Sequence, residues 1–268
     1  MTHRRNVTTD AEAKSPRYCA AIASDANTVR AAQRLRYRVF HAANAAEEPN
    51  DRLHPEAIDE DHFDRHCRHL VVRETATGAV VGTYRILTAE GARAAGGFYS
   101  ETEFDCSRLR RLPGRLVEVG RACVDPDHRS GAVISQLLGG LTRWVVAHRY
   151  DWVMGCASID LDDGVEAAAS LCGRLLREHS APEQWRVTPH TPFRIGPSSV
   201  PERTVPPLIK AYLRFGATVA GAPAFDEAFR TADVLMLLSM AAMAPRFRER
   251  LLRDDSTTRV VRRTPWAA

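Results

Sequence analysis

The stretch RLVEVGRACVDPDHRSGAVISQ, residues 115–136, predicts the centre of the fold. Its first part, Leu116 to Val124, is a β-branched, apolar run that is typical of a buried strand. The turn Asp125-Pro126-Asp127 follows, and Arg129-Ser130-Gly131-Ala132 then opens a long amphipathic helix. A strand that leads into a helix N-terminus presents free backbone N–H groups, which suit a phosphate. We therefore expect a phosphate-bearing ligand beside this turn.

Two charged side chains, Glu118 and Arg121, interrupt the apolar strand. Buried charges are costly unless they are paired or used in chemistry. They are three residues apart, so on a regular strand they face opposite sides. A structural interpretation pairs Glu118 with Arg85, which lies in another apolar run, as a buried ion pair. A functional interpretation makes Glu118 a base or amine anchor and the arginines carboxylate anchors.

The composition is that of an ordinary globular protein. The 268 residues suffice for one large domain or two small ones, with 44% hydrophobic and 26% charged residues. The formal net charge of +4 comes almost entirely from arginine, because Lys14 and Lys210 are the only lysines. Such a surface suits an acidic partner or an anionic membrane face. The excess is too small to indicate nucleic acid, and no nucleic-acid motif occurs.

Cysteine usage and hydropathy indicate a cytoplasmic protein. The six cysteines are scattered without a CxxC pair, which favours reduced, buried thiols over a disulfide framework. The first 16 residues lack the apolar core of a secretory signal. The longest strongly apolar run, Val234 to Ala244, is too short to span a membrane. We expect at most a peripheral contact with the inner face of the cytoplasmic membrane.

Periodicity and turn residues predict one mixed α/β domain at residues 17–240, after a flexible N-terminus at 1–16 and before a basic C-terminal helix and tail at 241–268. Strands are expected at 18–23, 69–73, 80–87, 116–124, 152–159, 217–220 and 234–239. Helices are expected at 24–40, from 101 onward, at 129–149, 162–179 and 207–215. This order lacks the regular alternation of a doubly wound sheet, so a mixed central sheet flanked by helices is predicted.

Several common motifs are absent. No GxxxxGK[ST], GxGxxG or GxSxG pattern occurs, which disfavours nucleotide hydrolysis, dinucleotide binding and a serine-nucleophile elbow. Histidine, cysteine and aspartate do gather at residues 61–69, but their spacing matches no strong zinc pattern. A hydrogen-bonded acid and histidine edge is the favoured interpretation, and no metal is expected.

Ordered motifs carry a resemblance to a known family. They are RLRYRVF (34–40), DEDHFD (59–64), VGTYRIL (81–87) and EVGRACV (118–124). This set resembles the acyl-carrier-protein-dependent N-acyltransferases of the GNAT fold, which include the acyl-homoserine lactone synthases. Further motifs look like the ornithine Nα-acyltransferases of ornithine-lipid synthesis: FYSETEFD (98–105), GCAS (155–158), PPLIKAYLRFGA (206–217) and FDEAFRTADVLML (225–237). The resemblance covers roughly residues 18–240.

Departures from the wider family narrow the expected reaction. Lactone synthases carry a tryptophan six residues after the phenylalanine that matches Phe40, where this chain has Ala46, and they lack the PPLIKAYLRFGA segment. Both differences disfavour lactone synthesis. The phosphate loop also has fewer glycines than the loop of acetyl-CoA-using relatives. A carrier protein offers one phosphodiester rather than a pyrophosphate, so a reduced loop fits that donor.

The resemblance implies transfer of a long-chain (3-hydroxy)acyl group from acyl carrier protein to the α-amine of ornithine, giving a lyso-ornithine lipid, with no bound cofactor. Glu118 and Arg121 are the expected catalytic residues, with Glu118 deprotonating the amine directly or through water. Substrate binding is assigned to Arg36, Asp61, Asp64, Arg85 and Ser158, the two aspartates holding the cationic side chain. The pantetheine phosphate is assigned to Val124, Arg129, Ser130, Gly131 and Ala132.

The expected partner is acyl carrier protein, docked on one of three arginine-rich segments near residues 108–115, 143–149 and 246–250. Three alternatives stay open. The first is a synthase of another N-acyl amino acid or of an acyl-homoserine lactone. The second is a non-catalytic module that binds acyl carriers or lipid, and the third is an acetyl-CoA acetyltransferase. The reduced loop disfavours the last.

Overall fold

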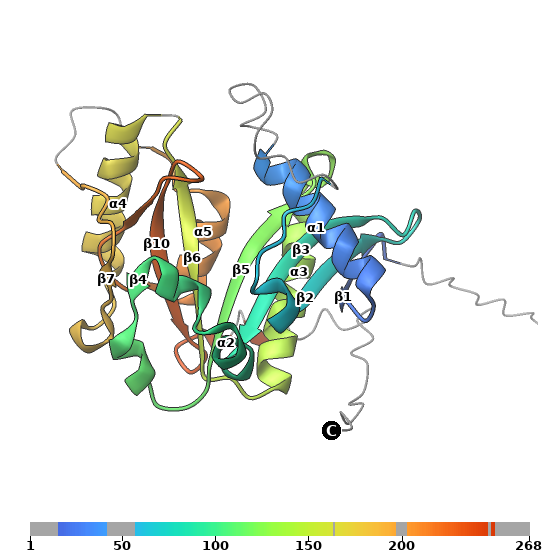
Figure 1. The fold of residues 1–268 in the computed structure, drawn as a ribbon, viewed down its shortest axis with the longest axis horizontal. Coiled ribbons are helices and arrows are strands. Elements are labelled where there is room, and N and C mark those ends of the chain that lie inside the picture. The colour runs from blue at the N-terminus through green and yellow to red at the C-terminus, as the bar shows by residue number, and fades with distance from the viewer. Residues whose placement is uncertain (1–15, 42–56, 163, 197–202, 246–247, 250–268) are drawn as a thin grey trace, which may run out of the picture.

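The computed structural model describes residues 16–41, 57–162, 164–196, 203–245 and 248–249. Its elements are β1 (Tyr18–Ile22), α1 (Ala26–His41), β2 (Arg68–Glu74), β3 (Val80–Thr88), α2 (Ala89–Ala95), β4 (Phe104–Asp105), β5 (Leu116–Val124), α3 (Ala132–Ala147), β6 (Trp152–Asp160), α4 (Val165–His179), β7 (Thr188–Pro189), α5 (Pro207–Phe215), β8 (Thr218–Val219), β9 (Ala224–Asp226) and β10 (Thr231–Ser239) (Figure 1). Short 3₁₀ turns include Tyr99–Thr102 and Ser107–Arg111.

One mixed sheet organises the molecule, as predicted. Its order is β1-β2-β3-β5-β6-β10-β8, with β9 also paired to β10, and every pair is antiparallel except β5 with β6. A separate two-stranded sheet joins β4 to β7. The long connection through α3 returns the chain from β5 to β6 so that they run in parallel, as such a pair requires.

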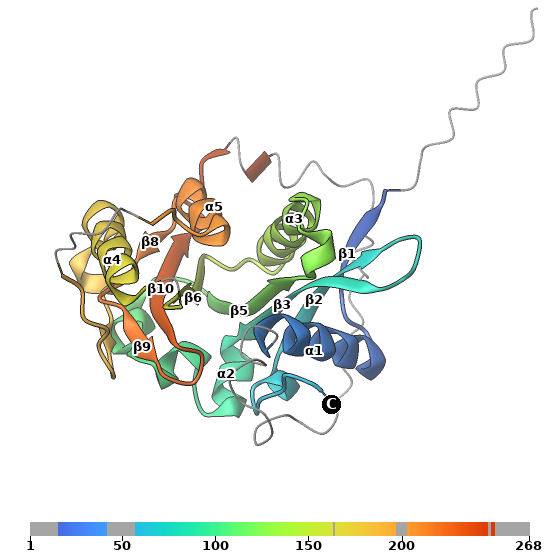
Figure 2. The same cartoon turned by 90° about the horizontal axis from the view of Figure 1, so that it is seen from above.

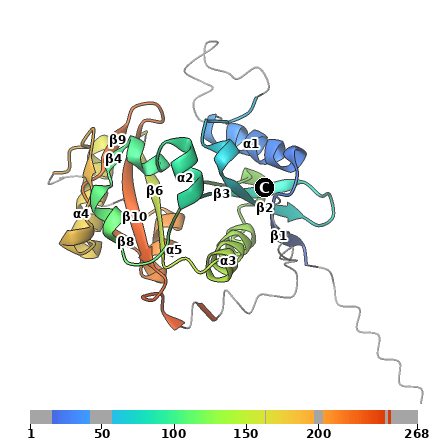
Figure 3. The same cartoon turned by 60° about the horizontal axis from the view of Figure 1, so that its bottom comes forward.

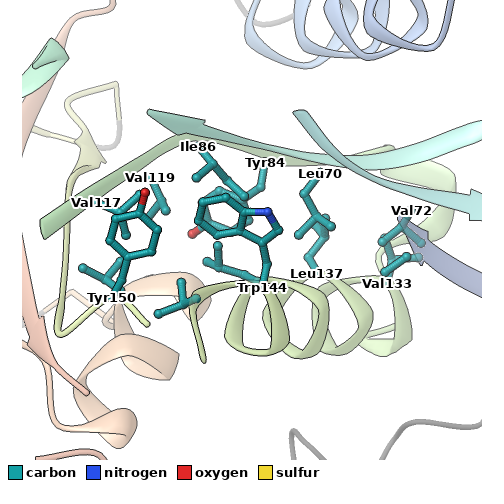
Figure 4. Close-up of a cluster of buried hydrophobic side chains, with 14 of the residues drawn as sticks. Leu70, Val72, Tyr84, Ile86, Val117, Val119, Val133, Leu137, Trp144 and Tyr150 are labelled. Carbon is teal, nitrogen blue, oxygen red and sulfur yellow. The ribbon is translucent and has the colours of Figure 1, made fainter. Parts of the chain in front are cut away.

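Helices cover both faces of the sheet. Figure 2 shows α3 and α5 on one face and α1 and α2 on the other, and Figure 3 gives the same arrangement from below. Helix α3 presents Val133, Leu137 and Trp144 to the strands, where they pack on side chains such as Leu70 and Val119 (Figure 4). This cluster removes a large apolar area from water and fixes α3 against the sheet.

The parallel pair of β5 and β6 is short. Only Leu116, Val117 and Glu118 of β5 have partners on β6, and the last pair joins Glu118 to Met154. Beyond that pair the strands diverge (Figure 1). Gly155 lies at the point of divergence, where an added Cβ would be 2.1 Å from the carbonyl oxygen of Val119. Among the described residues, the edge of β5 from Val119 onward therefore has no partner strand on its β6 side.

A bulge in β5 changes which residues face α1. The β3–β5 register shifts between Thr83 and Arg85, and Arg121 has a φ of +49°, a left-handed conformation that side chains rarely adopt. Side chains before and after the bulge alternate normally, but Arg121 contacts the α1 side of the sheet, as Glu118 does. The prediction that Glu118 and Arg121 face opposite sides is therefore wrong, because it assumed a regular strand.

Most predicted elements are confirmed within one to three residues. The helix predicted from residue 101 is wrong, because this segment forms two 3₁₀ turns separated by β4. Helix α4 begins at Val165, three residues later than predicted, and Gly164 precedes it. All six cysteines are free thiols. The N-terminus and most of the predicted C-terminal helix lie outside the described residues, as does Ala46.

None of the helices in the described ranges is long and apolar enough to cross a bilayer.

Candidate active site

A cavity of about 450 Å³ opens where β5 and β6 diverge. One part of its lining is apolar and comes largely from α3, α5 and the chain after β10. These residues include Leu138, Leu141, Val145, Leu208, Tyr212, Phe215, Met240 and Met243. The other part is polar and lies where β5, β6 and β10 meet. It includes Arg85, Tyr99, Glu118, Arg121, Cys156, Ser158, Asp226 and Asp233. The cavity thus has a long apolar region joined to a charged one.

Arg36 is the buried centre of an arginine–aspartate network, which consists of Arg36, Arg85 and Arg121 with Asp59, Asp61 and Asp64. The side chain of Arg36 is fully buried on the inward face of α1. Its Nη2 lies 2.8 and 2.9 Å from the two carboxylate oxygens of Asp64, and its Nε lies 2.9 Å from Asp59 Oδ1. A paired, buried guanidinium of this kind holds α1 and the following loop on the sheet.

Arg85 and Arg121 connect this network to the cavity. Arg85 Nη1 donates to Asp61 Oδ1 at 2.6 Å and approaches Asp64 Oδ2 at 3.4 Å. Arg121 lies 3.6 Å from both Asp59 and Asp61. Burial opposes ionisation of Asp61, but the guanidiniums of Arg85 and Arg121 outweigh it and lower the Asp61 pKa. The aspartates predicted to hold a cationic substrate are thus already paired with three arginines.

The Arg121 guanidinium lies in an aromatic cage at the cavity wall. Its Cζ is 5.0 Å from the ring centre of Phe229, 5.5 Å from that of Tyr99 and 5.9 Å from that of Phe40. Its Nε N–H is buried and has no hydrogen-bond acceptor within the described ranges. A guanidinium that is caged but incompletely paired is well placed for a carboxylate ligand.

Glu118 is buried at the same wall. Its carboxylate accepts the backbone N–H groups of Tyr99 at 2.6 Å and of Ser100 at 2.7 Å, together with the Ser100 hydroxyl. Burial raises the pKa of Glu118, although the Ser100 and Tyr99 hydrogen bonds oppose this effect. Arg85, the partner considered from sequence, makes its ion pairs with Asp61 and Asp64 instead. Glu118 therefore anchors the 3₁₀ turn Tyr99–Thr102 to β5.

A second group of carboxylates was missed from sequence. Glu103, Asp226 and Asp233 come from three separate segments and gather near Cys156. Asp226, Asp233 and Cys156 line the polar part of the cavity, and Glu103 lies beside Asp233 with both carboxylate oxygens buried. Donor atoms of Glu103, Cys156 and Asp233 lie within 4.8 Å of one another. Each acid lies inside a motif quoted above, but only the tertiary fold brings them together. We call Glu103, Asp226 and Asp233 the acidic wall.

Ser158 lies in the β6–β10 ladder directly opposite Asp233 and lines the cavity. The predicted phosphate residues lie elsewhere, between β5 and α3. Gly131 has a φ of +84° and precedes the first residue of α3, and Arg129, Ser130, Gly131 and Ala132 are exposed. Val124 is half-buried at the end of β5. These residues form an exposed helix N-terminus at the end of the strand that borders the cavity.

Of the arginines expected to dock a partner, those at the Ser107–Arg111 turn and Arg149 are exposed. Arg143 is wrong as a docking residue, because it is only 7% exposed within α3. Arg115 is exposed and stacks on the Tyr150 ring at 4.5 Å. Arg246 and Arg250 lie outside the described residues.

Comparisons with known proteins agree with this architecture. The model of the acetyltransferase (GNAT) domain matches residues 35–139. The L-ornithine N(alpha)-acyltransferase of Brucella abortus is 35% identical over 244 residues, covering 84% of this chain and 85% of that protein. The protein of the same name from Rhodobacter capsulatus is 36% identical over 240 residues, covering 85% and 92%.

Among solved structures, a CoA-dependent acyl-homoserine lactone synthase, BjaI, determined with MTA, aligns with a TM-score of 0.53. Its sequence is 14% identical, and the alignment covers 88% of this chain and 89% of that one. At this identity the likeness establishes a shared fold.

Proposed function

Because this chain belongs to the family of L-ornithine Nα-acyltransferases and is an acyltransferase of the GNAT fold, we propose that it acylates the α-amine of ornithine. The acyl donor in this proposal is a long-chain, 3-hydroxylated thioester of acyl carrier protein, and the product is a lyso-ornithine lipid. The observation that carries the proposal is the cavity between β5 and β6, which joins a caged arginine and a buried carboxylate to a long apolar region.

The chemistry requires little beyond positioning, since a thioester is already activated. The substrate ammonium first gives a proton to a base, and the neutral amine then attacks the thioester carbonyl. The amide forms as the C–S bond breaks, and the leaving thiolate takes up the second proton that the nitrogen loses. We assign the base to Glu118, acting directly or through a water molecule. Its raised pKa favours proton acceptance near neutral pH.

Binding of the acceptor is assigned to the caged arginine. The α-carboxylate would pair with Arg121, whose Nε is unpaired within the described ranges, and Arg85 orients that arginine through their shared partner Asp61. In this role Asp59, Asp61 and Asp64 hold the arginines in place. Arg36 supports them from behind as a positioning residue.

Binding of the donor is assigned to the divergent strands. Arg121 and Ala122 line the cavity and have no strand partner in either the β3 or the β6 ladder among the described residues, so we assign to their backbone N–H groups the polarisation of the thioester carbonyl. The pantetheine phosphate would reach the exposed helix N-terminus at Arg129–Ala132. The acyl chain would occupy the apolar region between α3 and α5, where Leu141, Tyr212 and Met243 contribute to the lining.

The test is a reconstituted reaction with purified protein, 3-hydroxyacyl-acyl carrier protein and ornithine, read by mass spectrometry. We expect an N-acylornithine whose fragments place the acyl group on the α-nitrogen. The same acyl-CoA offered at equal concentration separates the two donors. Absence of any N-acyl amino acid with either donor would refute the proposed function, whereas a product formed only from acyl-CoA would refute the carrier-protein donor.

A further inference from the structure

The acidic wall differs from the arginine–aspartate network in having no countercharge. In the network, three aspartates face three arginines. Neutral groups donate to the wall instead: Thr231 Oγ1 donates to Asp233 Oδ1 at 2.7 Å, and the Phe229 N–H donates to Asp226 Oδ1 at 3.1 Å. Within the described part of the chain, no arginine, lysine or histidine forms an ion pair with any of the three acids.

Glu103 is the least satisfied member of the wall. Both of its carboxylate oxygens are buried, and neither has a hydrogen-bond partner among the residues that the structure describes. Asp233, within a few ångströms, is 3% exposed. Two buried carboxylates at this separation cannot both be ionised without a cation or a shared proton. Burial, together with the charges of Asp233 and Asp226, raises the pKa of Glu103 to about 8.

The wall lies within the reach of one small molecule from the caged arginine. Phe229 connects them, because Arg121 stacks on its ring and its backbone N–H donates to Asp226. Tyr99 connects them as well, since it interacts electrostatically with Arg121 and also with Glu103 and Asp226. The polar part of the cavity therefore presents a positive group and a negative group to the same ligand. Glu118 lines the same cavity.

We propose that Asp226 and Asp233, which line the cavity, bind the side-chain ammonium of a basic amino acid acceptor while Arg121 binds its α-carboxylate, and that Glu103, buried beside Asp233, adds its negative charge to this site. This inference rests on the proposed function and adds to it the residues that select a cationic side chain. An ammonium supplies three donors and a positive charge to acids that have no countercharge in the described part of the chain, and it replaces the proton that the wall otherwise retains. The role that sequence assigned to Asp61 and Asp64 is thus given to a different set of acids.

The experiment compares ornithine with norvaline, which has the same carbon chain without the terminal ammonium. Wild-type protein should prefer ornithine strongly in kcat/KM. In Glu103→Gln and Asp233→Asn, the KM for ornithine should rise about 10- to 100-fold, because a charge-assisted contact is lost. The kcat/KM for norvaline should stay within about twofold of the wild-type value. Asp226→Asn, at a half-buried position on β9, repeats the test if either buried variant fails to fold.

Glu227→Gln is the matched control. Glu227 is the exposed neighbour of Asp226 and does not line the cavity, so its loss removes one negative charge without altering the wall. Its ornithine preference should equal that of the wild type. If all variants and this control retain the same preference, or if the wild type uses norvaline as well as ornithine, the inference fails while N-acyl transfer stands.

A divalent cation is the competing occupant, because Glu103, Cys156 and Asp233 have metal-ligand atoms. Ornithine preference should survive chelation with EDTA, and added Zn²⁺ should inhibit competitively with ornithine. Loss of the preference on chelation, restored by the metal, would overturn the assignment. If the wild type acylates no amino acid at all, the proposed function itself has failed, which is a different result from equal use of the two acceptors.

Discussion

Glu118 is held by three hydrogen bonds from Tyr99 and Ser100, yet it lines the cavity in which we propose that the amine loses its proton. A residue with both properties anchors the loop and accepts the proton at one fixed position. Burial raises the pKa of Glu118 above that of an ordinary carboxyl group, which makes it a stronger base than an exposed glutamate.

We expect Glu118→Gln to lower kcat by about 10²- to 10⁴-fold, because the amide cannot accept the proton. The acidic limb of the kcat–pH profile should disappear in this variant. Steady-state kinetics across pH check this, with the Tm measured alongside, since the amide N–H groups of glutamine would meet the donors of Tyr99 and Ser100. A folded variant with wild-type kcat would rule out the catalytic assignment.

The raised pKa of Glu103 predicts that the stability of the fold decreases as the pH rises, the reverse of the usual effect of a carboxyl group. Its pKa rises from 4.5 in the unfolded chain to about 8 in the folded protein, so the folded state retains the proton longer. The stability that this provides is complete below pH 4.5 and is lost as the pH rises toward 8. Glu103→Gln removes this loss. Its Tm should exceed that of the wild type near pH 8.5 and equal it near pH 4.5.

Thermal denaturation monitored by circular dichroism at both pH values tests this expectation. A shift of about 2–4 °C corresponds to each kcal/mol for a chain of this size. Burial also raises the pKa of Asp233. Asp233 therefore accounts for any fall in Tm with rising pH that persists in the variant. An equal Tm difference at the two pH values would contradict the assignment of the raised pKa to Glu103.

At the scale of the element, the bulge in β5 determines where the arginine points. Arg121 adopts its left-handed backbone at a cost, since non-glycine residues are strained there by roughly 1 kcal/mol. Without the register shift beside Arg85, the side chain of Arg121 would lie on the α3 face of the sheet. The fold thus accepts local strain at the position that we assign to the substrate carboxylate.

Replacement of Arg121 by glycine and by alanine separates these two effects. Both variants lose the guanidinium, so the KM for ornithine should rise at least tenfold in each, consistent with loss of a charge-assisted contact. Glycine adopts a positive φ without strain, so Arg121→Gly should be more stable than Arg121→Ala by roughly 1 kcal/mol. Urea denaturation and acceptor kinetics measure the two quantities. Equal stability of both variants would contradict the strain.

The elements that sequence predicts well are those that local residues specify. The strand at Leu116–Val124 is confirmed at both ends, and so is the helix at 207–215, which begins at a proline and is followed by Gly216 in a left-handed conformation. The bulge at Arg121 was not predictable, because it depends on register with another strand. The acidic wall was not predictable either, since Glu103 and Asp233 are 130 residues apart in sequence and meet only in the tertiary fold.

At the scale of the whole molecule, the excess of arginine bears on how the acyl carrier protein of the proposed reaction would dock. The chain carries a net charge of +4, and exposed arginines at 108, 110 and 111 lie together on one 3₁₀ turn. Glu101 pairs with Arg110 at 2.7 Å and Arg108 Nη1 donates to the Glu183 carbonyl oxygen at 2.9 Å, which leaves Arg111 as the more available charge of this turn. Such a surface accelerates association with an acidic carrier protein through long-range attraction.

We expect kcat/KM for acyl-acyl carrier protein to fall severalfold between about 50 and 300 mM NaCl, because salt screens charges beyond one Debye length. Arg111→Gln should lower the low-salt value and flatten this dependence, whereas Arg177→Gln, at an exposed site on α4, should change neither. Donor kinetics over a salt series provide the measurement. Identical salt profiles for both variants would exclude the 108–111 turn as the docking surface.

The three-residue parallel pair between β5 and β6 has a consequence for how occupancy can be observed. Arg121 and Ala122 lie beyond the last β6 pair and within the bulge of the β3–β5 ladder, so neither has a strand partner among the described residues and their amides should exchange with deuterium readily in the empty protein. A thioester seated there would slow their exchange while leaving that of Leu116 and Val117 unchanged. Mass-resolved exchange of this one peptide would then follow donor binding without any turnover.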